Sequence, residues 1–329
     1  MMDRRGFLCA LTRAPFALPL ALAAAKARGA AKVARLGYLT DRAGPSEFDE
    51  AFLRGMRELG YVEGDTLKIE YRWAAGKVER LPSMAAELVS LKVDVIVTSG
   101  VPAAKAAKQA TAVIPIVMAT SGDAVADGLV ASFANPGGNV TGRSLFTREL
   151  SQKRLEIIRE TLPGLAVVAA VFNASNPATP PQFIETQVAA ARLGIRAIPL
   201  ETRFPEGIDP AFAEAAAKGA GALVVISDSA TISHRDQLGN AGLRHKLPTM
   251  FANRAYLVGG GLMSYGPNIP DAFHAAAGYV DRILKGAKPG ELPLEQPNRF
   301  ELVINLKTAK ALGLPIPQSL ILRADQLIQ

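Results

Sequence analysis

The chain has 329 residues, of which 49% are hydrophobic and 20% are charged. This composition excludes a disordered chain, and the length suits about two domains that each bury a core without disulfides or a metal. The formal net charge is +7, but residues 1–27 carry four basic residues and one acidic residue, so the rest of the chain is only +4. That excess forms no Lys/Arg block and no basic stripe with aromatics, which argues against a nucleic-acid partner.

The first 27 residues have the three parts of a secretory signal peptide. A charged start at Asp3–Leu8 precedes an apolar stretch at Ala14–Ala25, and an Ala-Lys-Ala end predicts cleavage near Ala27. The Arg-Arg-x-Phe-Leu sequence in the charged start resembles a twin-arginine export signal. Pro15 and Pro19 interrupt the apolar stretch, which is too short for a membrane span of about 20 residues. We therefore expect a periplasmic protein; the alternative is an amphipathic N-terminal helix of a cytosolic protein.

After residue 32, short apolar runs alternate with helical patterns, which predicts βαβ units and a parallel sheet. The apolar runs, typical of strands covered on both faces, are Val33–Leu39, Val93–Val97, Val167–Phe172 and Ala222–Ile226. Apolar residues at helical spacing lie between them, at Phe48, Phe52, Met56 and Leu59, at Leu81, Met84, Leu88 and Leu91, and later at Phe273, Ala277, Val280 and Leu284. Ser46 with Asp49 three residues on, and Pro82, are helix start signals.

The alternation of strand and helix patterns occurs twice. The first series runs from Val33 to about Met118 and the second from Val167 to about Met250, with the turn-forming stretch Asn135–Asn139 between them. We therefore predict an α/β fold of two doubly wound parallel-sheet lobes joined by several chain crossings. A further extended stretch, Arg299–Ile304, is expected to lie back across or beside the first series.

Polar side chains gather at the predicted carboxyl ends of the strands, where open parallel sheets bind their ligands. The sequences there are Tyr38-Leu39-Thr40-Asp41, Thr98-Ser99-Gly100, Thr120-Ser121-Gly122-Asp123, Asn173-Ala174-Ser175-Asn176 and Ser227-Asp228-Ser229. Their hydroxyls, amides and carboxylates can hydrogen-bond a polar ligand without reacting with it. The same residue types are preferred helix caps, so each can cap, bind or do both.

Sequence motifs for catalysis, cofactors and metals are missing. Gly37 and Gly44 lack the dinucleotide-binding spacing, and Gly76-Lys77 lacks the rest of a phosphate-binding loop. The Ser144 segment lacks the final glycine of a nucleophile elbow. The only cysteine, Cys9, lies in the signal segment, and the three histidines, His234, His245 and His274, form no pair at metal-ligand spacing. We expect no metal, no cofactor and no enzymatic activity.

Six segments, in order, carry a resemblance to a known family. They are Gly60-Tyr61-Val62-Glu63-Gly64, Ile69-Glu70-Tyr71-Arg72-Trp73-Ala74, Gly128-Leu129-Val130-Ala131-Ser132, Pro136-Gly137-Gly138-Asn139-Val140-Thr141-Gly142, Gly260-Gly261-Leu262-Met263-Ser264-Tyr265-Gly266 and Phe300-Glu301-Leu302-Val303-Ile304-Asn305-Leu306-Lys307-Thr308-Ala309-Lys310. With these segments the chain resembles the substrate-binding proteins of ABC importers of the tryptophan/tyrosine type.

The resemblance implies a type I periplasmic binding fold, in which two α/β lobes close on a ligand about a hinge of three crossings. After a signal peptide at residues 1–27, residues 33–143 with part of 266–329 would form lobe 1, and residues 144–265 lobe 2. The hinge crossings would lie near 140–144, 252–266 and 299–305.

The resemblance also implies a ligand site. The loops Thr98–Gly100 and Ser121–Asp123 would hold the polar end of the ligand, opposite strand ends of the second lobe. The expected ligand-binding residues are Tyr38, Thr40, Thr98, Ser99, Gly100, Ser121, Asp123, Asn173, Asn176, Asp228, Asn253 and Tyr265. The two tyrosines would give an aromatic wall, with hinge packing as the other role for Tyr265. The chain departs from the family at Ala252–Tyr256, where relatives often carry Ser-Arg-Glu-Phe, and at Asp123–Asp127, so a relative's ligand does not transfer directly.

These features predict a non-catalytic, monomeric, periplasmic binding protein that delivers a small solute to an ABC permease and ATPase complex. An amino acid, aromatic or branched, fits best, with hydroxyls and helix N-termini for its carboxylate and Asp123 or Asp228 for its ammonium. The alternatives are a ligand-sensing domain that partners a membrane receptor and an enzyme with the same fold.

Overall fold

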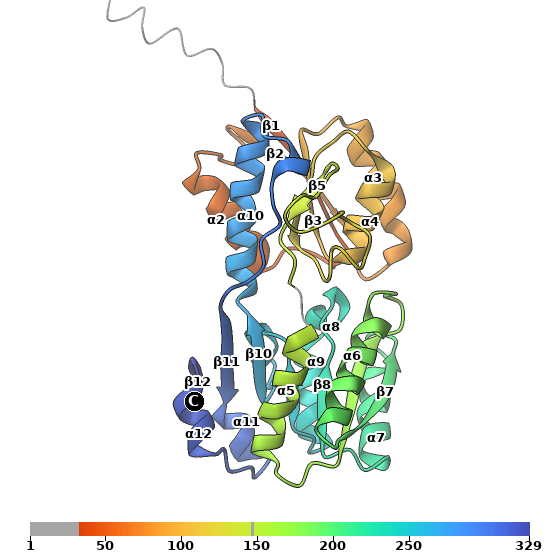
Figure 1. Ribbon diagram of the computed structural model, residues 1–329, viewed down its shortest axis with the longest axis vertical. Coiled ribbons are helices and arrows are strands. Elements are labelled where there is room, and N and C mark those ends of the chain that lie inside the picture. The colour runs from red at the N-terminus through yellow and green to blue at the C-terminus, as the bar shows by residue number, and fades with distance from the viewer. Residues whose placement is uncertain (1–32, 146–147) are drawn as a thin grey trace, which may run out of the picture. The chain divides into compact units, whose positions relative to one another are not determined.

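Two sheets, each covered by helices, make up the described part of the chain (Figure 1). The computed structural model describes residues 33–145 and 148–329. The predicted signal peptide at residues 1–27 lies outside the described residues. Within the described ranges, no helix has both the length and the apolar character that crossing a membrane requires.

The first sheet has five parallel strands in the order β2-β1-β3-β4-β5. They are β1 (Ala34–Thr40), β2 (Leu67–Trp73), β3 (Val95–Ser99), β4 (Ile116–Thr120) and β5 (Val140–Gly142). The helices are α2 (Glu47–Glu58), α3 (Leu81–Ser90), α4 (Val101–Ala110) and α10 (Ile269–Leu284), with a 3-10 turn η1 (Val78–Arg80). Helices α2 and α10 cover one face of the sheet, and α3 and α4 cover the other (Figure 1). We call this sheet and its four helices the first lobe.

The residues of β1 alternate between two cores. Leu36 and Tyr38 face the core that includes Phe52 of α2, whereas Leu39 faces the core that includes Leu88 of α3. Because both faces of the strand are covered, its sequence is a continuous apolar run instead of an alternating one. The predicted strand is confirmed.

Helix α2 begins where its capping sequence predicts. The Ser46 side chain accepts a hydrogen bond from the Phe48 backbone N–H, and the Asp49 carboxylate accepts one from the Ser46 backbone N–H at 2.7 Å. The apolar face predicted for this helix is buried except for Leu59, which is 42% exposed. Leu59 was expected to share that face, but it lies past the last residue of the helix.

The second sheet has seven strands in the order β12-β11-β10-β9-β8-β6-β7. They are β6 (Val167–Asn173), β7 (Arg196–Thr202), β8 (Ala222–Val225), β9 (Thr249–Phe251), β10 (Met263–Pro267), β11 (Phe300–Asn305) and β12 (Gln326–Ile328). Its helices are α5 (Arg148–Thr161), α6 (Thr179–Arg192), α7 (Ile208–Ala217), α8 (Ser229–Ser233), α9 (Arg235–Arg244), α11 (Leu306–Ala311) and α12 (Gln318–Arg323). The 3-10 turn η2 (Arg254–Leu257) contacts β10, whereas the 3-10 turn η3 (Pro289–Glu291) contacts β5 of the first sheet. We call the second sheet with α5 to α9, α11 and α12 the second lobe. The prediction of two α/β lobes on mainly parallel sheets is confirmed.

The extended stretch at Arg299–Ile304 does not lie across or beside the first series, as the sequence had indicated. It forms β11, which pairs antiparallel with β10 in the second sheet. After α10, the chain returns past Glu295, which bridges Arg143, and then runs back along the open edge of β10. A short apolar strand carries no signal for which sheet edge it will join, because either edge would satisfy its backbone hydrogen bonds.

The chain passes between the lobes after β5, after β10 and before β11. Glycines permit close backbone approaches at two of these crossings. A Cβ on Gly142, which has φ of +126°, would lie 2.3 Å from the Met118 carbonyl oxygen. A Cβ on Gly266 would lie 1.8 Å from the Ala252 carbonyl oxygen. No larger residue fits either position without moving the backbone.

Candidate functional site

A cavity of about 150 Å³ lies at the carboxyl ends of strands from both sheets. Its walls from the first lobe include Asp41, Arg42, Phe48, Phe273 and the loops 99–102 and 120–122. Its walls from the second lobe include Ser151, Arg154, Asn176, Gln182, Asn253 and residues 224–229. Since one water needs only about 10–15 Å³ in such a cavity, there is room for a small organic molecule.

Loops of the two lobes meet directly at this cavity. A Cβ on Gly100 of the first lobe would lie 3.5 Å from the Ser229 hydroxyl oxygen of the second lobe and 3.6 Å from Asp41 Oδ1. Arg235 of the second lobe lies 3.7 Å from Glu47 of the first, a partly exposed ion pair that contributes little stability. A ligand in the cavity would therefore touch both lobes at once.

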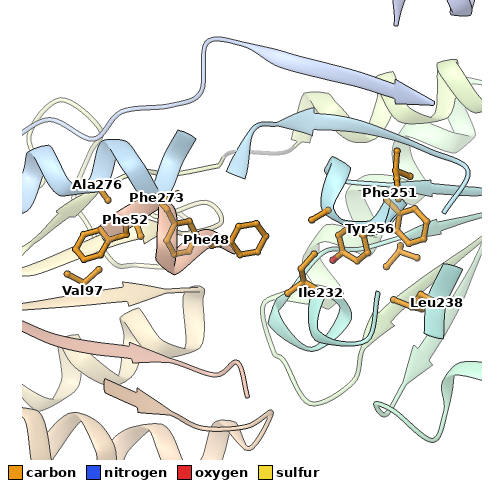
Figure 2. Packing of buried hydrophobic residues seen from close by; sticks show 14 of the residues in the cluster. Phe48, Phe52, Val97, Ile232, Leu238, Phe251, Tyr256, Phe273 and Ala276 are labelled. Carbon is orange, nitrogen blue, oxygen red and sulfur yellow. The ribbon is translucent and has the colours of Figure 1, made fainter. Parts of the chain in front are cut away.

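An aromatic pair forms one wall of the cavity. The rings of Phe48, from α2, and Phe273, from α10, stack with their centroids 5.5 Å apart. Figure 2 shows these two rings side by side, with Ile232 and Tyr256 on the opposite side of the view. Rings of this kind offer a large apolar surface to an apolar part of a ligand.

The positive charge of Arg42 in the cavity wall is already neutralised. Its guanidinium forms a buried ion pair with Asp49, including a hydrogen bond of 2.9 Å from Nη1, and also donates to Ser46 and to the Tyr38 hydroxyl. Arg42 also lies near the faces of Phe48 and Phe273. With these partners in place, Arg42 shapes the wall and has little capacity left for a ligand.

Asp228 belongs to a hydrogen-bonded network in the second lobe, in which each of its oxygens has a donor. Its Oδ2 accepts hydrogen bonds from Asn173 Nδ2 at 2.7 Å and Asn176 Nδ2 at 3.2 Å, and its Oδ1 accepts one from the Thr231 backbone N–H at 2.8 Å. This last bond makes Asp228 the N-cap of α8, and the Thr231 hydroxyl accepts the Asp228 N–H in return, which completes a capping box. The carboxylate therefore caps the helix and fixes both asparagines.

Asp41 lies at the end of β1, opposite Asp228. It is only 4% exposed, and its Oδ1 has no hydrogen-bond partner. Burial raises the pKa of this carboxyl to about 6; the Asp228 charge adds to the rise, and the Ser229 hydroxyl opposes it. A cation placed between the two lobes would relieve this cost.

Arg154, in α5, is a second buried charge in the wall. It is 6% exposed, its Nε donates to the Tyr265 carbonyl oxygen at 2.8 Å, and its Nη2 lies 3.5 Å from the Ala252 carbonyl oxygen. No ion pair joins it to a carboxylate among the described side chains, residues 33–145 and 150–329. Burial lowers the pKa of Arg154 to about 10.

The structure places the expected ligand-binding residues in two groups. Those that line the cavity are Ser99, Gly100, Ser121, Asn176, Asp228 and Asn253. Those that do not line it are Tyr38, Thr40, Thr98, Asp123, Asn173 and Tyr265. Of the first group, Ser121 has a buried hydroxyl without a hydrogen-bond partner, which leaves it available to a ligand.

The second group lies away from the cavity, and most of its members have local partners, although the buried Thr98 hydroxyl has no hydrogen-bond partner. The side chains of Tyr38, Thr40 and Thr98 are turned into the first lobe and are at most 1% exposed. Asp123 accepts a hydrogen bond from the Ala126 N–H at 3.0 Å. The ring of Tyr265 packs 6.2 Å from that of Phe300 on β11, so the aromatic wall expected from the two tyrosines is instead built by phenylalanines.

Sequence reasoning missed five wall residues that carry most of the character of the site. Asp41 and Arg42 directly follow Thr40 at a strand end that was examined, so their position was a usable signal. Phe48 and Phe273 were assigned to helix cores, which they join while also lining the cavity. Arg154 had no signal at all, because its helix reads as an ordinary amphipathic segment.

The composition of the wall suits a bound ligand that has both charged and apolar parts. It includes buried hydroxyls, one carboxylate with an open oxygen, one guanidinium and two rings. The three histidines lie elsewhere: His245 contacts Asp209, His274 contacts Glu58, and His234 stacks on Phe204. In the described ranges, no group of three His, Cys, Asp or Glu side chains is placed to hold a metal ion.

Comparisons with known proteins agree with this picture. The family model described as ABC transporter substrate binding protein matches residues 43–328. A protein of Clostridioides difficile (strain R20291) named tyrosine-binding protein is 26% identical over 265 residues, which cover 80% of this chain and 76% of that protein.

Two solved structures are also similar. The crystal structure of an ABC domain in complex with L-Trp from Streptococcus pneumonia has a TM-score of 0.83 and 27% identity, covering 90% of this chain and 99% of that chain. The crystal structure of a conserved domain protein from Vibrio cholerae has a TM-score of 0.85 and 28% identity, covering 90% of this chain and all of that one. The expected resemblance and the two-lobed binding fold are confirmed.

Replacing Asp228 by asparagine should destabilise the empty protein. All three partners of Asp228 are hydrogen-bond donors, whereas an asparagine amide has one accepting oxygen and one donating NH2 group. The NH2 group of the variant would therefore face another donor, either the Thr231 N–H or the NH2 groups of Asn173 and Asn176. Those two cannot turn over freely, because their oxygens already accept backbone N–H groups. We expect Asp228→Asn to lower the free energy of unfolding by about 1–3 kcal/mol in denaturant titrations. Ser233→Ala, in the same helix, should change it by less than about 0.5 kcal/mol, and an equally small effect of Asp228→Asn would contradict the network.

The buried Asp41 should make the stability of the empty protein depend on pH. Its pKa rises from 3.8 in the unfolded chain to about 6 in the folded one, so its contribution is most favourable below pH 4 and is lost as the pH rises through 6. The change amounts to at most about 3 kcal/mol. Asp41→Asn should therefore stabilise the protein at pH 7 and lose this advantage at pH 4. Parallel stability curves of the variant and the wild type between pH 4 and 7 would contradict the assignment.

Proposed function

Since the chain belongs to the family of ABC transporter substrate binding proteins, we propose that it captures an amino acid with an aromatic or branched side chain and delivers it to an ABC permease. The family consists of solute-binding proteins and is not a family of enzymes. The amino acid would occupy the cavity between the two lobes.

One observation carries the proposal: the cavity wall combines buried polar groups that lack partners with an aromatic pair. The unpartnered groups are Asp41 Oδ1 and Ser121 Oγ, and the stacked rings of Phe48 and Phe273 lie in the same wall. An amino acid has a charged end that would bind the unpartnered polar groups and a side chain that would contact the two rings. The names of two similar proteins, which mention tyrosine and L-Trp, support the same class of ligand.

Ligand binding would drive closure of the two lobes. A ligand shifts an open–closed equilibrium only through contacts that differ between the two states. Groups from both lobes line the cavity, so a ligand bound there would contact both lobes at once. The ion pair of Arg235 with Glu47, which also joins the lobes, is partly exposed and adds little stability. The ligand would therefore stabilise the closed state, which the permease would then recognise.

We expect the purified protein, residues 28–329, to bind at least one aromatic or branched L-amino acid with one-to-one stoichiometry in calorimetric titrations. Saturation at a hundred times the dissociation constant should add about 2.7 kcal/mol to the free energy of unfolding. The D-enantiomer of the same amino acid is the control and should bind more weakly. Heat from sugars, nucleosides or aromatic acids, with none from any amino acid, would contradict the proposal.

The site of action would be the periplasm, where the monomer would meet the permease and ATPase complex after cleavage near Ala27. Replacing Arg4 and Arg5 by lysine should leave unprocessed precursor in the cytoplasm, because the twin-arginine route recognises that pair. Fractionation of cells that express the full chain measures this. Unchanged export of the variant would contradict the twin-arginine route but not the prediction of a signal peptide. Retention of the wild-type chain in the cytoplasm would contradict both the export route and the signal peptide.

A further inference from the structure

We propose that Arg154 of the second lobe binds the carboxylate of the ligand and that Asp41 of the first lobe binds its ammonium group. This assignment rests on the proposed function, an amino acid in the cavity, and specifies how that ligand is held. It differs from the sequence-based expectation, which gave the carboxylate to hydroxyls and the ammonium to Asp123 or Asp228.

The carboxylate assignment follows from the unbalanced charge of Arg154. A guanidinium has five N–H donors, and here one is used by Tyr265 and a second makes only a long contact with Ala252. Both acceptors are neutral carbonyl oxygens, so they do not balance the charge. A buried cation without an anion is costly, and a carboxylate can accept two parallel N–H bonds from a guanidinium. Because Arg154 lines the cavity, that anion can come from the ligand.

The ammonium assignment follows by comparing the carboxylates near the cavity. Asp123 does not line it, and both oxygens of Asp228 are occupied by Asn173, Asn176 and Thr231. Asp41 has an open oxygen and faces the like charge of Asp228.

Arg42, the next residue in the chain, only partly offsets the charge of Asp41. Its charge opposes the rise in the Asp41 pKa, but its guanidinium forms its ion pair with Asp49 and none with Asp41. An ammonium group would give Asp41 both the hydrogen bond and the ion pair that it lacks.

The two charges come from different lobes, which ties recognition to closure. Arg154 lies in α5 of the second lobe, whereas Asp41 follows β1 of the first. A ligand that carries both an anionic and a cationic group engages both lobes, while one that lacks either charge engages only one of them through an ion pair. The site should therefore discriminate an amino acid from its amine and from its acid.

The test pairs each variant with the ligand analogue that lacks the matching group. The probes are L-tryptophan, tryptamine and indole-3-propionate, or L-leucine, 3-methylbutylamine and 4-methylpentanoate if the wild type prefers a branched ligand. Affinities are measured by calorimetry for the wild type, Arg154→Met and Asp41→Asn. Arg159→Met, an exposed position in the same helix, is the control.

We expect the wild type to bind the amino acid at least about ten-fold more tightly than either analogue, as charge-assisted hydrogen bonds imply. The Arg154→Met variant should bind the amino acid no more tightly than the amine, but still more tightly than the acid. The Asp41→Asn variant should bind the amino acid no more tightly than the acid, but still more tightly than the amine. Arg159→Met should match the wild type. A merely structural role of Arg154 in holding the Tyr265 and Ala252 carbonyls would weaken all three ligands alike.

Two outcomes would overturn the assignment while leaving the proposed function intact. One is an Arg154→Met variant that still prefers the amino acid over the amine. The other is a wild type that binds the amine as tightly as the amino acid, a result that needs no variant to fold. Failure of the wild type to bind any amino acid would instead refute the proposed function.

Discussion

Charges buried beside the cavity need partners, and the loops around it are organised by that requirement. Asp49 pairs with Arg42 in the first lobe, and Asn173, Asn176 and Thr231 satisfy Asp228 in the second. These internal partners hold the strand ends and the start of α8 in place without a ligand. Arg154 and Asp41 form no ion pair with the described side chains, although the charge of Arg42 partly offsets that of Asp41. The internally paired groups therefore hold the wall in place around two charged groups that are open to a ligand.

The same division explains why binding and lobe closure can be coupled. Glycines at 142 and 266 let the crossing strands pack tightly against neighbouring backbone, so the crossings run through well-packed segments. Arg154 also holds two carbonyls at the second of these crossings, those of Ala252 and Tyr265. The Arg154 side chain therefore connects the cavity wall to the backbone of a hinge crossing, and a ligand that binds Arg154 would contact the protein close to the hinge.

Local signals predicted the fold well, and the site only in part. The capping pair Ser46 and Asp49, and the buried run of β1, depend on neighbours in sequence and were correctly predicted. The position of β11 was wrong, because it depends on which sheet edge was open. The orientation of Thr98 at a strand end is set by the alternation of the sheet, and Arg154 reaches the cavity only through the packing of α5 against the hinge. Long-range packing of this kind leaves no local pattern.

The charge balance of the wall also narrows the side chain that the ligand can carry. Asn253 caps the η2 turn through its own side-chain oxygen and adds no charge to the wall. With the proposed assignment, the carboxylate of a zwitterion would balance the charge of Arg154 and its ammonium group would balance that of Asp41. A further cation on the ligand would find only Asp228, whose oxygens are occupied, and a further anion would find only Arg42, which is paired with Asp49. The remaining wall of Phe48 and Phe273 is apolar, so the geometry favours a neutral, apolar side chain over a basic or an acidic one.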